Sequence, residues 1–398
     1  MLSVMADDKE AGSLDYNAQK REFIFNYTHD NPISLTMPYR SKSYLSTYNI
    51  HPIFDMNMPE GYLFSLFKNL LTKEYGEIND YILFTHLSRT IEGYLTYKDN
   101  KEKKNTVKLD LEEVLHDKDT NLFTKLVHLF LEQSAISGVQ PKVLAQLIDK
   151  ATLSQREYII KTFSDEYPHL AENEYFSMKA LTYSGLKVPK FWLSDNKKLF
   201  IMEKFTYKKS DNNFYGFEEF CVLFDLNKEK KYSGNYEQIA KSIAKISTQK
   251  EEDLNDFFKM IVMSYLLKNG DAHLKNFGIC YEADLSKRFL APAYDVVNTC
   301  IYLPKDKPAL TMFGKKTWVS KETLLKFGTT YCLLNSKEAL KEFDICVEAV
   351  LKIRKEIVSY MEHNEAFYDV GRKFIAIIDF SLKENIHKEY KDISDGIL

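Results

Sequence analysis

The sequence feature that most constrains the fold is an apolar run that ends in a short polar loop. The run extends from Phe257 to Leu267, and the loop covers residues 269–278. The loop carries Asp271 and, five residues later, Asn276. An apolar run of this length is typical of a buried helix, so we expect the core to hold the loop that follows it.

A second acidic residue, Asp295, lies in Tyr-Asp-Val on the next strand-like segment. An Asp, an Asn and a later Asp in this order are typical of phosphotransferases, in which they act as the base and the two metal ligands. Asn offers Mg²⁺ a neutral oxygen, and Gly270 allows a tight turn before Asp271. An ordinary polar loop is the alternative, but the apolar run and the Tyr-Asp-Val segment favour a site.

The composition indicates a well-packed protein without a membrane span. Hydrophobic residues make up 44% of the 398 residues and aromatic residues 14%. The net charge of −3 does not support a general attraction to nucleic acid or anionic membranes. The first residues lack the apolar segment of a signal peptide. Five scattered cysteines predict neither a disulfide framework nor a zinc site, so a reducing cytoplasm is expected.

The front of the chain is predicted to be a small α+β unit. Residues 23–27 and 33–37 alternate like strands, and residues 92–97 predict another strand. Helices are predicted from Gly61 and over 81–87. A charged segment at 101–105 is typical of a solvated linker.

Residues 157–163 form the clearest predicted strand, and Lys161 lies on one face of it between apolar neighbours. In kinases a lysine in this position binds the α- and β-phosphates and pairs with a helix glutamate, for which Glu174 is the better candidate. Residues 187–193 and 198–205 predict a hairpin that ends where a kinase has its adenine-binding hinge.

Residues Ser137, Gly138, Val139 and Gln140 form a turn that has two interpretations. Their backbone N–H groups could cover phosphates, or they could simply connect a hairpin. The rest of the chain is predicted to be mostly helical. The predicted helices cover Phe217–Phe224, Tyr236–Ile246, Leu254–Leu267, Lys321–Phe327, Lys337–Ile345, Ala349–Met361 and Ala366–Phe380.

Several of these motifs, in this order, resemble the HipA-like family of bacterial serine/threonine kinases, the toxins of HipBA-type toxin–antitoxin modules. The resemblance covers nearly the whole chain, and the Ser-bearing loop is its most specific part. The matching segments are Ile33–Pro38, Pro59–Gly61, Ser137–Lys142, Asn173–Phe176, Met202–Phe205, Asn269–Phe277 and Ala291–Asp295. Val222 departs from the family, whose members carry Gln after the Cys.

The resemblance implies an α+β, bilobal protein-kinase-like fold with an extra N-terminal α+β subdomain and a helical C-terminal lobe. We expect the subdomain at 1–105, the kinase N-lobe with the Ser-Gly loop at 106–205, and the C-lobe with the catalytic loop at 206–398.

The resemblance also implies the roles of individual residues in ATP- and Mg²⁺-dependent phosphorylation of a protein hydroxyl. Asp271 would be the base, Asn276 and Asp295 the metal ligands, and Lys161 the phosphate-binding lysine. The other implied residues are Glu203 and Phe205 in the adenine pocket, His273 and Lys275 near the phosphates, and Ser137, Gly138, Val139, Gln140 and Lys142 in the nucleotide-binding loop.

Regulation and partners follow from the same resemblance. Ser137 would be autophosphorylated, which would eject the loop and inactivate the enzyme, although Ser134 is a second candidate acceptor. Known targets in the family are aminoacyl-tRNA synthetases, and the usual partner is a helix-turn-helix antitoxin, through which DNA would be contacted indirectly.

Two other functions use overlapping features. Small-molecule kinases of the aminoglycoside and choline kinase type have a similar Gly-Asp-x-x-x-x-Asn loop, and fold alone does not separate them from protein kinases. The Ser137 loop and the N-terminal subdomain favour the protein kinase. A non-catalytic module that sequesters a regulator is disfavoured, because Asp271, Asn276 and Asp295 are all present.

Overall fold

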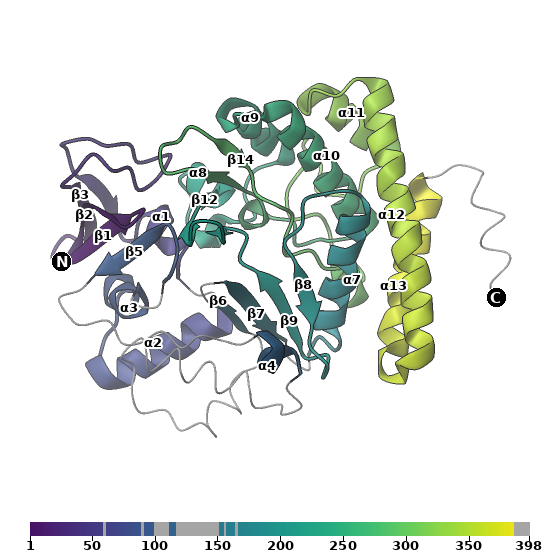
Figure 1. The fold of residues 1–398 in the computed structure, drawn as a ribbon, viewed down its shortest axis with the longest axis horizontal. Helices are drawn as coiled ribbons and strands as arrows, with labels where there is room; N and C mark the ends of the chain where they lie inside the picture. The colour runs from purple at the N-terminus through teal and green to yellow at the C-terminus, as the bar shows by residue number, and fades with distance from the viewer. Residues whose placement is uncertain are drawn as a thin grey trace. The chain divides into compact units, whose positions relative to one another are not determined.

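The computed structural model describes residues 1–58, 61–88, 91–98, 111–116, 151–154, 157–163 and 166–385. It is a mixed α+β structure (Figure 1). The chain divides into two compact units. The first unit comprises Met1–Glu166, Lys190–Lys231 and Cys280–Ser286, and the second comprises Tyr167–Pro189, Tyr232–Ile279 and Lys287–Leu398. The three-domain division expected from the sequence stays a prediction.

A five-stranded antiparallel sheet opens the first unit, in the order β4-β3-β2-β1-β5. Its strands are β1 (Leu2–Ala6), β2 (Lys9–Asn17), β3 (Glu22–Tyr27), β4 (Tyr44–Thr47) and β5 (Leu95–Lys98). Asp7 and Asp8 join β1 to β2 with φ of 50° and 59°, which a two-residue hairpin turn requires and Asp tolerates. Sequence reasoning missed β1 and β2. It also predicted a strand at 33–37, where the structure has only an isolated bridge between Ser34 and Met37.

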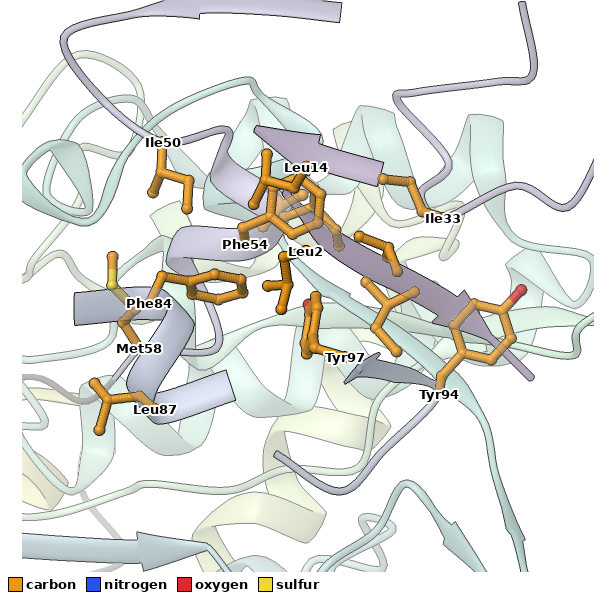
Figure 2. Packing of buried hydrophobic residues seen from close by; sticks show 14 of the residues in the cluster. Leu2, Leu14, Ile33, Ile50, Phe54, Met58, Phe84, Leu87, Tyr94 and Tyr97 are labelled. Carbon is orange, nitrogen blue, oxygen red and sulfur yellow. The ribbon is translucent and has the colours of Figure 1, made fainter. Parts of the chain in front are cut away.

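Helices α1 (Pro52–Asp55), α2 (Gly61–Tyr75) and α3 (Asp80–Leu87) contribute to the buried core of this unit. Figure 2 shows Phe54 and Phe84 beside Leu2 and Tyr97. The rings of Phe54 and Phe84 are 5.7 Å apart, and Phe84 meets Tyr97 edge to face at 4.9 Å. Aromatic pairs in these geometries stabilise a core beyond the area that they bury.

A four-stranded antiparallel sheet, ordered β6-β7-β9-β8, follows in the same unit. Its strands are β6 (Ala151–Ser154), β7 (Tyr158–Thr162), β8 (Phe191–Leu193) and β9 (Leu199–Glu203). Ile160 and Ile201 from this sheet belong to the same buried cluster as the N-terminal residues. The predicted hairpin is therefore present, and its apolar face shares a core with the N-terminal sheet.

Short elements complete the first unit, namely α4 (Leu111–Leu115), β10 (Tyr207–Lys208), β11 (Asn213–Phe214), β12 (Gly216–Glu219), α8 (Phe220–Leu223) and the 3₁₀ turn Lys228–Lys230. The helix predicted over 217–224 is wrong in its first turn. Strand β12 forms there instead, and its first residue, Gly216, lies close to the ring of Tyr281, where a Cβ would come within 2.0 Å of the ring. Glu218 is fully buried on that strand.

The second unit is mainly helical. Its helices are α7 (Leu170–Tyr183), α9 (Tyr236–Ile246), α10 (Lys250–Leu266), α11 (Lys321–Tyr331), α12 (Ser336–His363) and α13 (Tyr368–Asn385), with 3₁₀ turns at Leu274–Asn276, Thr299–Ile301 and Glu365–Phe367. Strand β14 (Arg288–Leu290) also lies in this unit, and β13 (Gly278–Tyr281) begins in it. Two predicted helices at 337–345 and 349–361 form the single helix α12, because no Gly or Pro interrupts the segment between them.

Helix α10 organises this unit. Every residue from Phe257 to Leu266 is buried, as the apolar run predicted. Helix α10 packs against α9 and α12, and α12 packs along α13 (Figure 1). Among the described residues, no helix is both long enough and apolar enough to span a bilayer.

Candidate active site

The polar loop begins where α10 ends. The Asn269 N–H donates to the Ser264 carbonyl at 2.8 Å, and the Asn269 side chain accepts from the Asp271 N–H at 3.1 Å. Tyr236 on α9 donates its hydroxyl to the Ala272 carbonyl at 3.0 Å. Backbone and side-chain hydrogen bonds thus tie the loop to two core helices, which fixes the residues that flank Asp271.

Gly270 is needed for space. A Cβ at this position would lie 2.0 Å from Oδ2 of Asp306, and the φ of Gly270 is not in the left-handed region. The Gly270 N–H donates to the Thr299 hydroxyl at 2.8 Å, and this hydroxyl lies 2.5 Å from Asp306 Oδ2. The predicted turn is present at residues 270–271, but the need for a glycine there comes from the space that Asp306 leaves. Asp306 and Thr299 support the loop, and sequence reasoning missed both.

The Asp271 carboxylate is half exposed, with 48% of its side chain accessible. Its Oδ1 atom accepts a hydrogen bond from the Tyr232 hydroxyl at 2.7 Å. The Nε2 atom of His273 lies 3.9 Å from the same oxygen. The ring of His273 is buried and meets the ring of Tyr232 edge to face, with centroids 5.2 Å apart. An accessible carboxylate that is fixed on one side has the geometry of a base for an incoming hydroxyl.

Asn276 and Asp295 meet directly. The Asn276 Nδ2 atom donates to Asp295 Oδ2 at 2.8 Å, and its Oδ1 atom accepts from the His273 N–H at 3.0 Å. Asp295 has a φ of 59°, in the left-handed region, which Asp adopts more readily than most residues. Backbone strain of this kind clusters at functional sites. The 3₁₀ turn Leu274–Asn276 brings the amide to the carboxylate.

This pair fits Mg²⁺ by its chemistry. An amide oxygen and a carboxylate are the hard oxygen ligands that Mg²⁺ prefers, and Mg²⁺ commonly takes one or two carboxylates together with phosphate oxygens. The Asn276 carbonyl oxygen has a second lone pair beyond the one that accepts from His273. The residues that would hold the ion are Asn276 and Asp295.

Lys275 is the half-buried member of the same turn. Its carbonyl accepts a hydrogen bond from the Tyr294 hydroxyl at 2.7 Å. This contact connects the turn to the residue just before Asp295. In the second unit, the structure therefore brings Asp271, His273, Asn276 and Asp295 together around one short loop, with Lys275 in that loop.

Three expected nucleotide-binding residues lie in the first unit. Lys161 is half buried on β7, directly opposite Phe200 on β9, and its Nζ atom is 5.8 Å from the Phe200 ring centroid. Glu203 ends β9, where its carboxylate binds Lys209 at 2.8 Å and its N–H donates to the Lys190 carbonyl at 2.8 Å. The Phe205 ring meets Phe217 edge to face at 5.2 Å.

Two further sequence predictions concern buried side chains. Glu174 is buried on α7, in the second unit. Val222, the departure from the family pattern, is buried in the core of the first unit.

The predicted nucleotide-binding loop lies outside the described residues. This applies to Ser134, Ser137, Gly138, Val139, Gln140 and Lys142.

Tyr232 lies among the described residues, and the sequence analysis did not identify it as a site residue. It is separated from Asp271 by 39 residues, and no spacing motif in the sequence connects the two.

Comparison with known proteins gives two family matches. Residues 2–98 match the HipA N-terminal domain, and residues 134–359 match the HipA-like C-terminal domain. Together these matches include every site residue named above.

The chain is also similar to curated proteins that are named as kinases. The chain is 31% identical over 184 residues to a Haemophilus influenzae protein named "Putative kinase", a match that covers 42% of this chain and 53% of that protein. It is 29% identical over 202 residues to "Putative kinase Y4dM" of Sinorhizobium fredii, covering 46% and 49%. The chain thus spans about half the length of the curated relatives that it matches.

The structural similarity extends over nearly the whole chain. The structure superposes with a TM-score of 0.70 on a chain of the Shewanella oneidensis MR-1 toxin–antitoxin complex of HipA, HipB and operator DNA. The match covers 96% of this chain and 97% of that one at 15% identity, which supports the fold. With its N- and C-terminal domains both matched, the chain belongs to the HipA-like family.

Proposed function

We propose that this chain is an ATP- and Mg²⁺-dependent serine/threonine protein kinase that acts as the toxin of a toxin–antitoxin module. The observation that carries the proposal is the convergence of Asp271, Asn276 and Asp295 on one short, core-anchored loop. The relatives named as kinases and the family assignment support it.

In this proposal each residue has a separate task. Asp271 accepts the proton of the acceptor hydroxyl as that oxygen bonds to the γ-phosphorus of ATP, and the bond from this phosphorus to ADP breaks, so that ADP leaves. Asn276 and Asp295 hold Mg²⁺, which when bound neutralises charge that develops on the phosphates. His273 fixes Asn276 through its N–H and, with Lys275, adds positive or polar groups near the phosphates.

The first unit would supply the nucleotide contacts. Lys161 would bind the α- and β-phosphates, and Glu203 and Phe205 would line the adenine pocket. The loop containing Ser137, Gly138, Val139, Gln140 and Lys142 would cover the phosphates through its backbone N–H groups.

Partners and regulation are part of the same proposal. The protein substrate would be a translation component such as an aminoacyl-tRNA synthetase, which places the reaction in the cytoplasm. A helix-turn-helix antitoxin would bind both the kinase and DNA, so the kinase would contact DNA only indirectly. The Shewanella complex, in which HipA and HipB occur together with operator DNA, supports this arrangement. Phosphorylation of Ser137 would add about −1.5 to −2 charges beside the triphosphate and expel the loop.

The direct experiment incubates the purified chain with Mg²⁺ and γ-labelled ATP. We expect labelling of the chain on the peptide that contains Ser137, together with a loss of activity in step with the label. Peptide sequencing separates Ser137 from Ser134, and Asp271→Asn should remain unlabelled. A wild-type chain that neither labels itself nor transfers phosphate to dephosphorylated casein or to a panel of aminoacyl-tRNA synthetases would contradict the proposal.

A further inference from the structure

The two oxygens of the Asp271 carboxylate have different surroundings. Oδ1 accepts from the Tyr232 hydroxyl at 2.7 Å and has His273 Nε2 at 3.9 Å. Oδ2 has no hydrogen-bond partner among the residues that the structure describes. A carboxylate that is held through one oxygen is fixed in rotation, so its other oxygen faces a defined direction.

The position of Tyr232 suits such a role. Its ring rests edge to face on the buried ring of His273, and the Lys316 ammonium lies 6.0 Å from its centroid. Its side chain is nevertheless 46% exposed, so Tyr232 contributes little to the core. The chain thus presents a tyrosine hydroxyl at the candidate base while leaving the ring at the surface.

We infer that Tyr232 is a positioning residue for the phosphoryl transfer. It holds Oδ1 of Asp271, so that Oδ2 alone receives the proton of the acceptor hydroxyl. This inference rests on the proposed function, because it takes Asp271 as the base. It adds to that function a residue from a distant part of the chain, just before α9.

The geometry favours this role over a second one. A tyrosine hydroxyl on a catalytic carboxylate could instead occupy the place of the acceptor and have to leave before transfer. In that case the remaining oxygen would have no role, and removal of the hydroxyl would lower the KM for the acceptor. For a positioning residue, removal of the hydroxyl lowers kcat, because the carboxylate then samples unproductive rotations.

The test compares Tyr232→Phe with the wild-type chain, using Mg²⁺, γ-labelled ATP and dephosphorylated casein as a general hydroxyl acceptor. Phe keeps the ring contact with His273 and removes only the hydroxyl. Loss of a hydrogen bond to a charged group changes an equilibrium or a rate by about tenfold or more. We therefore expect kcat to fall about tenfold. The KM for ATP and the melting temperature should stay unchanged.

A matched control is Tyr368→Phe. Tyr368 is 48% exposed at the start of α13, and its contact in the structure is with Arg372. This variant should keep the wild-type kcat. This control shows whether removing any surface tyrosine hydroxyl lowers kcat, or only the hydroxyl that contacts Asp271.

A double-mutant cycle supplies a measurement that a purely structural role would not affect. Single-turnover rates at high enzyme concentration are compared for Asp271→Ala with and without Tyr232→Phe. With the carboxylate gone, Tyr232 has nothing to hold, so its substitution should cost less than about twofold. Independent, additive losses would show that Tyr232 acts elsewhere and would overturn the inference.

The remaining outcomes distinguish this inference from the proposed function. An active wild-type chain, an inactive Asp271→Asn and a fully active Tyr232→Phe would refute the positioning role alone. A lower KM for casein in Tyr232→Phe would also refute it, in favour of a hydroxyl that competes with the acceptor. An inactive wild-type chain, or an active Asp271→Asn, would instead refute the proposed function.

Discussion

Glu218 in the first unit and Asp271 in the second each accept a hydrogen bond from a tyrosine hydroxyl, yet the surroundings of these two carboxylates differ. Glu218 is completely buried, and both of its oxygens are used: Oε1 accepts from the Leu35 N–H at 2.6 Å and from Tyr281 at 3.0 Å, and Oε2 accepts from the Ser34 hydroxyl at 2.9 Å. Asp271 is half exposed, and the described residues use only one of its oxygens.

The difference teaches how to tell a structural carboxylate from a chemical one. Glu218 joins the 33–37 segment to Tyr281, two parts of the first unit that are far apart in sequence, and its complete burial closes it to a ligand from solvent. The Tyr232 hydroxyl holds one oxygen of Asp271, which orients the other oxygen. Substitutions at Glu218 should therefore change stability, whereas substitutions at Asp271 should change activity.

The largest expected effect is on the reaction rate of Asp271→Asn. Asn can still accept the Tyr232 hydrogen bond, but it cannot accept the acceptor's proton, so we expect a loss of about 10²–10⁴ in kcat. The melting temperature should stay the same, because the side chain is half exposed. Turnover of γ-labelled ATP by the folded variant at close to the normal rate would remove Asp271 from the role of base.

The second effect concerns nucleotide affinity and Asp295. Asp295→Ala removes the proposed Mg²⁺ ligand, so it should weaken Mg²⁺·ATP binding by about tenfold or more, beyond any change in Asp271→Asn. Calorimetric titration measures both variants. Ala is strained at a φ of 59°, so Asp295→Asn is the matched control, since Asn tolerates this φ. Equal affinity in Asp271→Asn and both Asp295 variants would contradict separate roles for the two aspartates.

Most of the second unit could be predicted from the sequence. The apolar run gave α10, and the fixed spacing of Asp271, Asn276 and Asp295 gave the loop, because local patterns determine these features. Strand β2 was missed because it includes several polar and small side chains, such as Lys9, Glu10 and Gly12, that do not alternate clearly, and β1 is a short strand of only five residues. Their stability comes from pairing with β3 and β5.

Contacts between distant residues could not be predicted in the same way. The Tyr232 hydrogen bond spans 39 residues, and the Ser34 bond to Glu218 spans 184. Neither follows from a periodicity or a spacing rule, since each depends on how separate elements pack. The same holds for Gly270, whose need for space arises from Asp306, 36 positions further along the chain.

The third effect is on stability. Glu218→Ala leaves the Tyr281 hydroxyl, the Ser34 hydroxyl and the Leu35 N–H without their acceptor inside the core. An unsatisfied buried donor costs about 1–3 kcal/mol, so we expect a loss of about 3 kcal/mol or more in the free energy of unfolding. Urea denaturation measures it, and an exposed glutamate such as Glu348 is the control. A loss below about 1 kcal/mol would show that the donors find other partners.

The smallest effect is the pH dependence that Glu218 imposes. Burial raises the pKa of Glu218 from 4.5 to about 7, so the folded state binds this proton more tightly than the unfolded state does. Its contribution to stability is therefore complete below about pH 4.5 and is lost as the pH rises to about 7. His51, in the same unit, acts in the opposite direction: burial lowers its pKa from 6.5 to about 4, so its contribution is complete above about pH 6.5 and is lost as the pH falls to about 4.

In the wild-type chain, the effects of Glu218 and His51 on the pH dependence of stability oppose each other. The substitution Glu218→Gln separates the two effects. Gln fills nearly the same volume and does not titrate. As the pH rises from about 5 to about 8, the variant should gain on the order of 2 kcal/mol in the free energy of unfolding relative to the wild type. In this variant the loss of stability at acidic pH that His51 causes should remain, without the opposing effect of Glu218. Urea titrations of both proteins at the two pH values provide the measurement. A difference that does not change with pH would mean that Glu218 stays charged in the core, held by its three donors, and that its burial is fully offset by hydrogen bonds.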